Sequence, residues 1–141
     1  MGESLLTQPF PRVDGEIRCG EMRAAELAER FGTPLYVYDG RRIDRRVEAF
    51  QRAFSAVDHL IAYSVKANGN LTILRRLRDL GCGADITSLG ELYRARRAGI
   101  ESSRIVFAGV GKTTEEMRAA LEEGIYAFNV ESAGELERLD S

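Results

Sequence analysis

DITSLGEL, residues 85–92, recurs further along the chain as NVESAGEL, residues 129–136. Each copy passes from an apolar stretch into Ser-x-x-Glu, a capping box in which the two side chains satisfy free N–H groups at the start of a helix. A third box, Thr113-Thr114-Glu115-Glu116, follows another apolar stretch. Three boxes that each follow an apolar stretch predict a chain built of strand–helix units.

Four apolar stretches predict the strands of these units, and they lie near residues 60–66, 84–87, 104–108 and 125–130. Segments with helical periodicity follow the first two, through Ile73, Leu74, Leu77 and Leu80 and then Leu92, Ala95 and Ala98. Strands that alternate with helices indicate parallel βαβ units with right-handed crossovers. An open nucleotide-binding sheet is disfavoured because no G-x-G-x-x-G opens a helix, and GVGKT at 109–113 lacks the first glycine of a phosphate loop.

The beginning of the chain has a different pattern. A short helix is predicted at about 22–31 with Gly32 as its C-terminal cap, followed by an extended run at 33–38 and a helix over 41–56. We expect residues 1–38 to contribute to a β domain and residues 39–141 to form a partial barrel. The expected fold class is α/β, the first half of a (β/α)8 TIM-type barrel, because eight strands close such a barrel and four are predicted here. We therefore expect this chain to be part of a longer one.

The composition excludes several classes of function. The net charge of -2 argues against nucleic-acid binding, and the apolar runs are too short to span a bilayer. The two cysteines, Cys19 and Cys82, lie far apart, which fits free thiols in a reducing cytoplasm. His59 is the only histidine, and no cluster has the spacing of a metal site. We expect a cytoplasmic protein without a metal centre.

YSVKAN at residues 63–68 contains the most informative candidate, Lys66. A period of two places Leu60, Ala62, Ser64 and Lys66 on one face of the predicted strand and leaves Tyr63 to pack against helices. A lysine at the carboxyl end of a barrel strand, beside small residues, suits a Schiff base to an aldehyde cofactor. The ordinary alternative is a solvated strand-end lysine, and a solvated loop position is what we expect of Lys112.

Three stretches together resemble the diaminopimelate decarboxylases, pyridoxal-phosphate enzymes of the alanine-racemase-like, fold-type-III group. They are FGTPLYVYD at 31–39, YSVKAN at 63–68 and GCGADITSLGEL at 81–92; RIVFAG at 104–109 and FNVES at 128–132 match further on. The resemblance covers about residues 22–141. It implies pyridoxal 5'-phosphate as cofactor, an amino-acid substrate, decarboxylation of meso-diaminopimelate to L-lysine, and a homodimer when the protein is full length.

The resemblance also implies roles for four residues. Lys66 is similar to the lysine that holds the cofactor, and Asp85 and Glu91 are similar to acidic residues near it. We expect Lys66 and Asp85 to be catalytic, and Ser64, with Glu91, to line the cofactor. For Asp85 the alternative is a strand-end turn residue, and for Glu91 it is a capping partner of Ser88. The family's phosphate-binding and substrate-binding residues are expected beyond residue 141, so we expect the chain alone to be inactive.

Other functions stay open at this stage. A related decarboxylase could act on ornithine, arginine or carboxynorspermidine, although FGTPLYVYD argues against it. A non-catalytic pyridoxal-phosphate-binding barrel is a second possibility, which a helix at the very start of the chain would favour. A third is a pseudoenzyme that serves as a partner of a full-length homologue.

Overall fold

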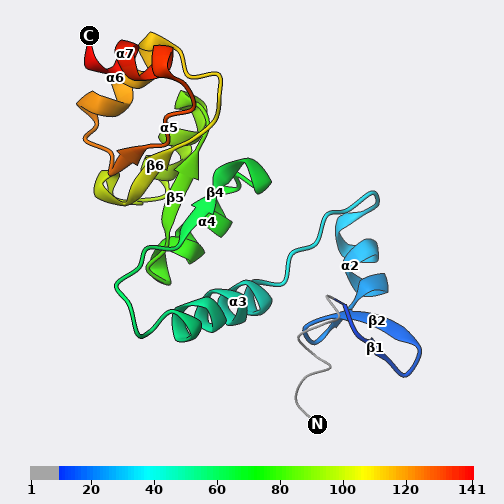
Figure 1. Cartoon of the computed structure of the whole chain (residues 1–141). Helices are drawn as coiled ribbons and strands as arrows, with labels where there is room; N and C mark the ends of the chain where they lie inside the picture. The colour runs from blue at the N-terminus through cyan, green and yellow to red at the C-terminus, as the bar shows by residue number, and fades with distance from the viewer. Residues whose placement is uncertain (1–9) are drawn as a thin grey trace. The chain divides into compact units, whose positions relative to one another are not determined.

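The computed structural model describes residues 10–141, and the chain divides into two compact units, Met1–Arg46 and Val47–Ser141. Figure 1 shows the elements of both. The boundary falls within α3 (Gly40–Ala53), which was expected over 41–56.

The N-terminal unit contains a small antiparallel sheet and one helix. The strands β1 (Arg12–Val13), β2 (Glu16–Cys19) and β3 (Met22–Arg23) pair in the order β1-β2-β3, and α2 spans Ala24–Phe31. The expected start of this helix at residue 22 is wrong by two residues, because Met22 and Arg23 pair with β2. Gly32 is confirmed as the cap: its φ is 81°, and its N–H donates to Ala28 O at 2.8 Å.

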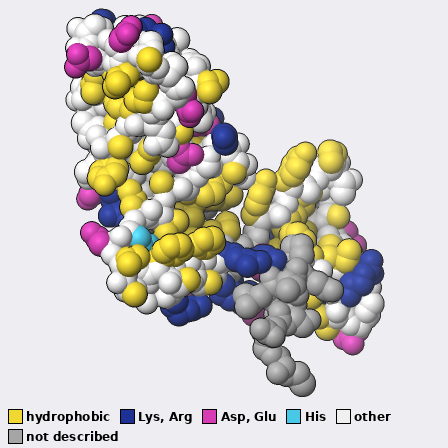
Figure 2. All heavy atoms as spheres, viewed as in Figure 1, with side chains coloured by type: hydrophobic (Ala, Val, Ile, Leu, Met, Phe, Trp, Pro, Cys, Tyr) yellow, Lys and Arg dark blue, Asp and Glu magenta, His cyan; other side chains and the backbone are white. Residues whose placement is uncertain are grey.

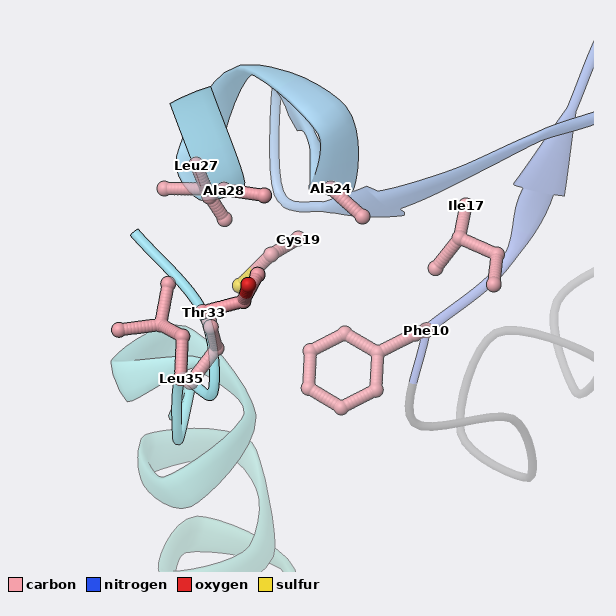
Figure 3. Close-up of a pocket in the computed structure, with 9 residues that line it drawn as sticks. Phe10, Ile17, Cys19, Ala24, Leu27, Ala28, Thr33 and Leu35 are labelled. Carbon is pink, nitrogen blue, oxygen red and sulfur yellow. The ribbon is translucent and has the colours of Figure 1, made fainter. Parts of the chain in front are cut away.

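An apolar hollow of about 310 Å³ lies within the N-terminal unit. Figure 3 shows side chains from β2, α2 and the segment after α2 pointing into it, including Cys19, Leu27 and Leu35. None of the four predicted site residues lines this hollow. Desolvation by burial raises the pKa of the Cys19 thiol, as does the charge of Asp39.

The second unit contains the parallel strand–helix repeat. Its strands β4 (Ala62–Ser64), β5 (Gly83–Ile86), β6 (Ile105–Phe107) and β7 (Ala127–Phe128) pair in parallel in chain order. The helices α4 (Leu71–Asp79), α5 (Leu89–Arg97), α6 (Thr114–Glu122) and α7 (Ala133–Asp140) follow the strands one by one. Two 3-10 turns, η1 (Val65–Ala67) and η2 (Ser102–Arg104), complete the unit. The parallel βα prediction is confirmed. The strands β4, β6 and β7 are shorter than the apolar stretches that indicated them, whereas β5 has the expected length and begins one residue earlier.

One face of this sheet forms the core with the helices. Ala84, Ile86, Ile105 and Phe107 alternate along β5 and β6 and are fully buried, and Leu74, Ala95 and Ala120 join them from α4, α5 and α6. Tyr63 packs against the same core, as expected. Alternate positions on the opposite face carry short side chains, among them Ala62, Ser64, Asp85 and Ala127.

Gly83 allows the close approach of two parts of the chain at the start of β5. A Cβ atom at this position would lie 2.1 Å from the carbonyl oxygen of Arg104, well inside van der Waals contact. The backbone of η2 can therefore reach β5 only because residue 83 has no side chain.

Several apolar side chains around α3 remain exposed. Phe50 and Phe54 stack at a centroid distance of 6.5 Å, and His59 contacts Phe54 at 5.8 Å. Figure 2 shows the histidine against hydrophobic side chains on this surface. His59 therefore has an aromatic environment and belongs to no metal cluster; the described residues contain no group of His, Cys, Asp and Glu that could hold a metal ion.

Candidate functional site

The predicted site residues lie at or beyond the carboxyl ends of neighbouring strands. Parallel strands end at one edge of a sheet, so the segments after β4, β5, β6 and β7 meet there. In barrels of this architecture that edge carries the active site. Ser64 ends β4, Asp85 lies in β5, and Glu91 lies in the first turn of α5.

Lys66 lies beyond the end of β4. The prediction that the strand runs to residue 66 is wrong: β4 ends at Ser64, and Lys66 belongs to the turn η1. The helix α4 begins shortly after this turn, and its cap residue Asn70 accepts a hydrogen bond from Thr72 N at 2.9 Å. Lys66 is exposed, and its amine has no hydrogen-bond or ion-pair partner among residues 10–141.

Ser64 and Asp85 occupy paired positions on adjacent strands, with Ser64 in register with Asp85. Ser64 Oγ and Asp85 Oδ1 are both buried and have no hydrogen-bond partner in the described part of the chain. Buried polar atoms are nearly always paired with protein, water or a ligand, so two unpaired oxygens side by side indicate a place for a polar group. Small neighbours such as Ala62 leave this face of the sheet free of bulk.

Glu91 fixes the segment between β5 and α5. Ser88 caps the helix by accepting from Glu91 N at 3.3 Å. The reciprocal half of the expected capping box is absent among the bonds found here, because the Glu91 carboxylate accepts instead from Thr87 N at 2.7 Å and from Thr87 Oγ1 at 3.1 Å. The geometry thus gives Glu91 a structural partner in Thr87.

Lys112 is buried, and the expectation of a solvated loop lysine is wrong. Only 4% of it is exposed, and its Nζ donates to Gly109 O at 2.6 Å, Asn129 O at 2.8 Å and Glu135 Oε1 at 2.5 Å. The hydrogen bond from Lys112 holds the pKa of Glu135 below its ordinary value, so the pair is ionic. The sequence did not reveal this pair, because its two members lie in different strand–helix units.

The site has the chemistry to hold a flat aldehyde cofactor. It offers the free primary amine of Lys66 and, beside a surface of small residues, the hydroxyl of Ser64 and the carboxylate of Asp85, which can stabilise a cation. The remaining thiol near the sheet, Cys82, is buried, and desolvation raises its pKa, so it stays protonated. Across residues 10–141 no helix is long and apolar enough to cross a membrane.

Comparisons with known proteins identify relatives of this chain. Diaminopimelate decarboxylase from Pseudomonas aeruginosa is 48% identical to this chain over 130 residues, which cover 92% of this chain and 31% of that protein. The crystal structure of diaminopimelate decarboxylase from M. jannaschii with L-lysine superposes with a TM-score of 0.82 at 43% identity, over 93% of this chain and 32% of that one. Lysine/ornithine decarboxylase from Vibrio vulnificus is more distant, with a TM-score of 0.73 at 25% identity, over 81% and 31% of the two chains.

The chain spans about a third of the length of these relatives. The described sheet matches the N-terminal part of the barrel in their structures, which confirms the expected α/β fold class. Residues 40–141 match the family described as "Pyridoxal-dependent decarboxylase, pyridoxal binding domain". The chain therefore belongs to the pyridoxal-dependent decarboxylases, and its second unit lies within their pyridoxal-binding domain.

Proposed function

We propose that this chain contributes the part of the pyridoxal-phosphate site of a diaminopimelate decarboxylase that contains the attachment lysine. In this proposal Lys66 holds the cofactor. One observation carries the proposal. The sequence contains two lysines, Lys66 and Lys112. All three N–H groups of Lys112 are engaged by acceptors, whereas the amine of Lys66 is exposed and unpaired among the described residues. Lys66 is thus the lysine that can react with an aldehyde.

The cofactor, when bound, supplies an aldehyde that condenses with amines and a ring that takes up the electrons released when carbon dioxide leaves. Lys66 would hold the cofactor through its free amine. The Asp85 carboxylate would stabilise positive charge beside the Lys66 amine. The small side chain of Ser64 leaves space above the sheet and offers a hydroxyl beside Asp85. Glu91 positions the segment after β5 through its hydrogen bond with Thr87.

The proposed substrate is meso-diaminopimelate, with L-lysine as product. Two comparisons support it: relatives named diaminopimelate decarboxylase are 48% identical to this chain, and the lysine/ornithine enzyme is 25% identical. The antiparallel strands of the N-terminal unit support a decarboxylase with a β domain over a lone cofactor-binding barrel, and we propose that residues 1–38 contribute to that domain. A homodimer of the complete protein is part of the same proposal.

Borohydride trapping tests the attachment lysine. The protein made from its complete open reading frame is incubated with pyridoxal phosphate, reduced with borohydride, digested and mapped by mass spectrometry. We expect the label on the peptide that contains Lys66. Lys112 serves as the internal control, because a buried, saturated amine should stay unlabelled. A label on Lys112, or none on either lysine, contradicts the proposal.

A substrate panel tests the reaction. Carbon dioxide release is measured with meso-diaminopimelate, ornithine, arginine and carboxynorspermidine. Release from meso-diaminopimelate alone supports the proposed activity. Preference for one of the other amino acids assigns the chain to a related decarboxylase, and trapping at Lys66 without release from any of them assigns a binding barrel.

A further inference from the structure

The buried pair formed by Lys112 and Glu135 is the strongest feature that the proposed function does not use. These are the two buried charged residues of the part of the chain that the structure describes, with exposures of 4% and 2%. An ammonium group has three donors and no acceptor, and here each donor has its own oxygen. The amine is therefore held in one position.

The three acceptors come from separate parts of the carboxyl edge. Gly109 lies in the segment between β6 and α6, Asn129 follows β7, and Glu135 lies in the first turn of α7. The second oxygen of Glu135 accepts from Glu131 N at 3.3 Å. A single ion pair thus fixes both segments that follow β6 and β7.

The neighbouring helix contains a related contact. Glu116, in the first turn of α6, closes a capping box with Thr113 and also accepts from Leu89 N, at the start of α5, at 3.3 Å. Glu116 and Glu135 hold equivalent positions in consecutive helices, and each reaches back to the preceding strand–helix connection. The segments at the carboxyl edge are therefore joined one to the next by first-turn glutamates.

Stability alone does not account for a buried ion pair. The desolvation of both charges offsets most of their attraction, and well-packed apolar residues of similar volume are often as stable or more so. What the pair provides is a fixed geometry, because removing either partner leaves unsatisfied groups in the interior. The pair lies at the same edge of the sheet as Lys66 and Asp85, so the segments that it fixes belong to the edge that carries the candidate site.

We propose that Lys112 and Glu135 form a clamp that positions the segments 109–112 and 129–131 for cofactor binding, so that Lys112 is a positioning residue and not an attachment lysine. This inference rests on the proposed pyridoxal-phosphate site. A ligand binds more tightly to segments that are already held in the bound geometry, because less ordering is needed on binding. Loss of the clamp should therefore affect cofactor affinity more than folding.

A double variant, Lys112→Met with Glu135→Met, tests the clamp in the protein made from its complete open reading frame. Because both charges are removed together, no charge is left unpaired, and we expect a thermal unfolding midpoint near that of the wild type. The Kd for pyridoxal phosphate should rise roughly 10- to 100-fold. Amide hydrogen exchange in 109–112 and 129–131, measured without cofactor, should become faster.

The matched control is Arg96→Met with Glu123→Met. This ion pair, at 2.5 Å, joins the C-terminal ends of α5 and α6 and is partly exposed, so its loss should leave the cofactor Kd unchanged. A folded clamp variant that binds pyridoxal phosphate as tightly as the wild type would overturn the proposal, as would unchanged hydrogen exchange in both segments.

A second measurement needs no substitution. In the wild-type protein the Glu131 amide should exchange slowly, because it donates to the clamped carboxylate; fast exchange would overturn the clamp even if the double variant does not fold. Exchange also separates this inference from the proposed function, because it reports the clamp without cofactor, whereas borohydride trapping reports Lys66 alone.

Discussion

Ser64 and Asp85 mark the candidate site by their unpaired polar atoms. Both place an unpaired oxygen in the interior of the protein, and both lie on one face of adjacent strands. An unsatisfied buried hydroxyl lowers stability, because the group has lost its hydrogen bonds to water without replacement. A folded chain keeps such a group where another requirement, here the proposed cofactor, outweighs the loss.

Ser64→Ala tests this interpretation. We expect the free energy of unfolding without cofactor to stay the same or to rise by about 1 kcal/mol, because a buried unpaired hydroxyl is removed. We expect the Kd for pyridoxal phosphate to increase in the same variant. Urea unfolding and equilibrium dialysis measure the two quantities. A marked loss of stability without cofactor would show instead that the hydroxyl has a structural partner.

Lys66 and Lys112 mark what could and could not be predicted at single residues. Lys66 was chosen as a candidate because it was predicted to end an apolar strand, and its assignment to that strand was wrong. Alternation of apolar residues shows which face a side chain occupies, but it does not show where pairing ends. The burial of Lys112 depends on Glu135, 23 positions away in sequence, and no local pattern encodes such a contact.

At the scale of elements, the helix starts were the most predictable feature. A capping box is local, and Ser88, Thr113 and Ser132 each accept a hydrogen bond from the backbone N–H three residues later. Two of the three glutamates nevertheless bind groups outside their capping box: the Glu91 carboxylate binds Thr87, and the Glu135 carboxylate binds Lys112. Sequence thus predicted where the helices begin, and tertiary contacts decide what the glutamates bind.

Gly83 determines whether β5 can form beside η2. In Gly83→Ala, the added methyl group would collide with the carbonyl oxygen of Arg104 at the amino end of β5. We expect a loss of about 3 kcal/mol in the free energy of unfolding, at the upper end of the range for overpacked sites. Chemical denaturation measures it. The control is Gly111→Ala, where an added Cβ meets nothing within 4 Å; equal effects of the two substitutions would contradict the steric explanation.

At the scale of the whole molecule, the acid side of the stability profile follows from three glutamates. The pKa values of Glu26, Glu116 and Glu135 all lie below the ordinary glutamate value of 4.5, chiefly because each carboxylate accepts hydrogen bonds. When the folded pKa is lower than the unfolded one, the unfolded state binds more protons in that range, and stability rises with pH. The contribution is present above about pH 4.5 and is lost as the pH falls through the folded values.

Glu135→Gln and Glu116→Gln should therefore flatten the acid limb of the stability profile. As the pH falls below about 4.5, we expect the free energy of unfolding of each variant to decrease less than that of the wild type, because one titrating group is gone. Urea unfolding at a series of pH values measures the slopes. Glu115→Gln is the control, because the neighbouring Glu115 side chain is exposed to solvent. An unchanged slope in Glu135→Gln would show that the ion pair does not contribute to acid sensitivity.

The burial of Lys112 also shapes the chemical reactivity of the surface. Every cationic side chain of the sequence other than the two lysines is an arginine, and guanidinium groups resist acylation under conditions that modify amines. Within residues 10–141, an acylating reagent thus meets one accessible side-chain amine, that of Lys66. If Lys66 holds the cofactor as proposed, a filled site protects this side-chain amine, and the extent of its acylation reports whether the site is filled.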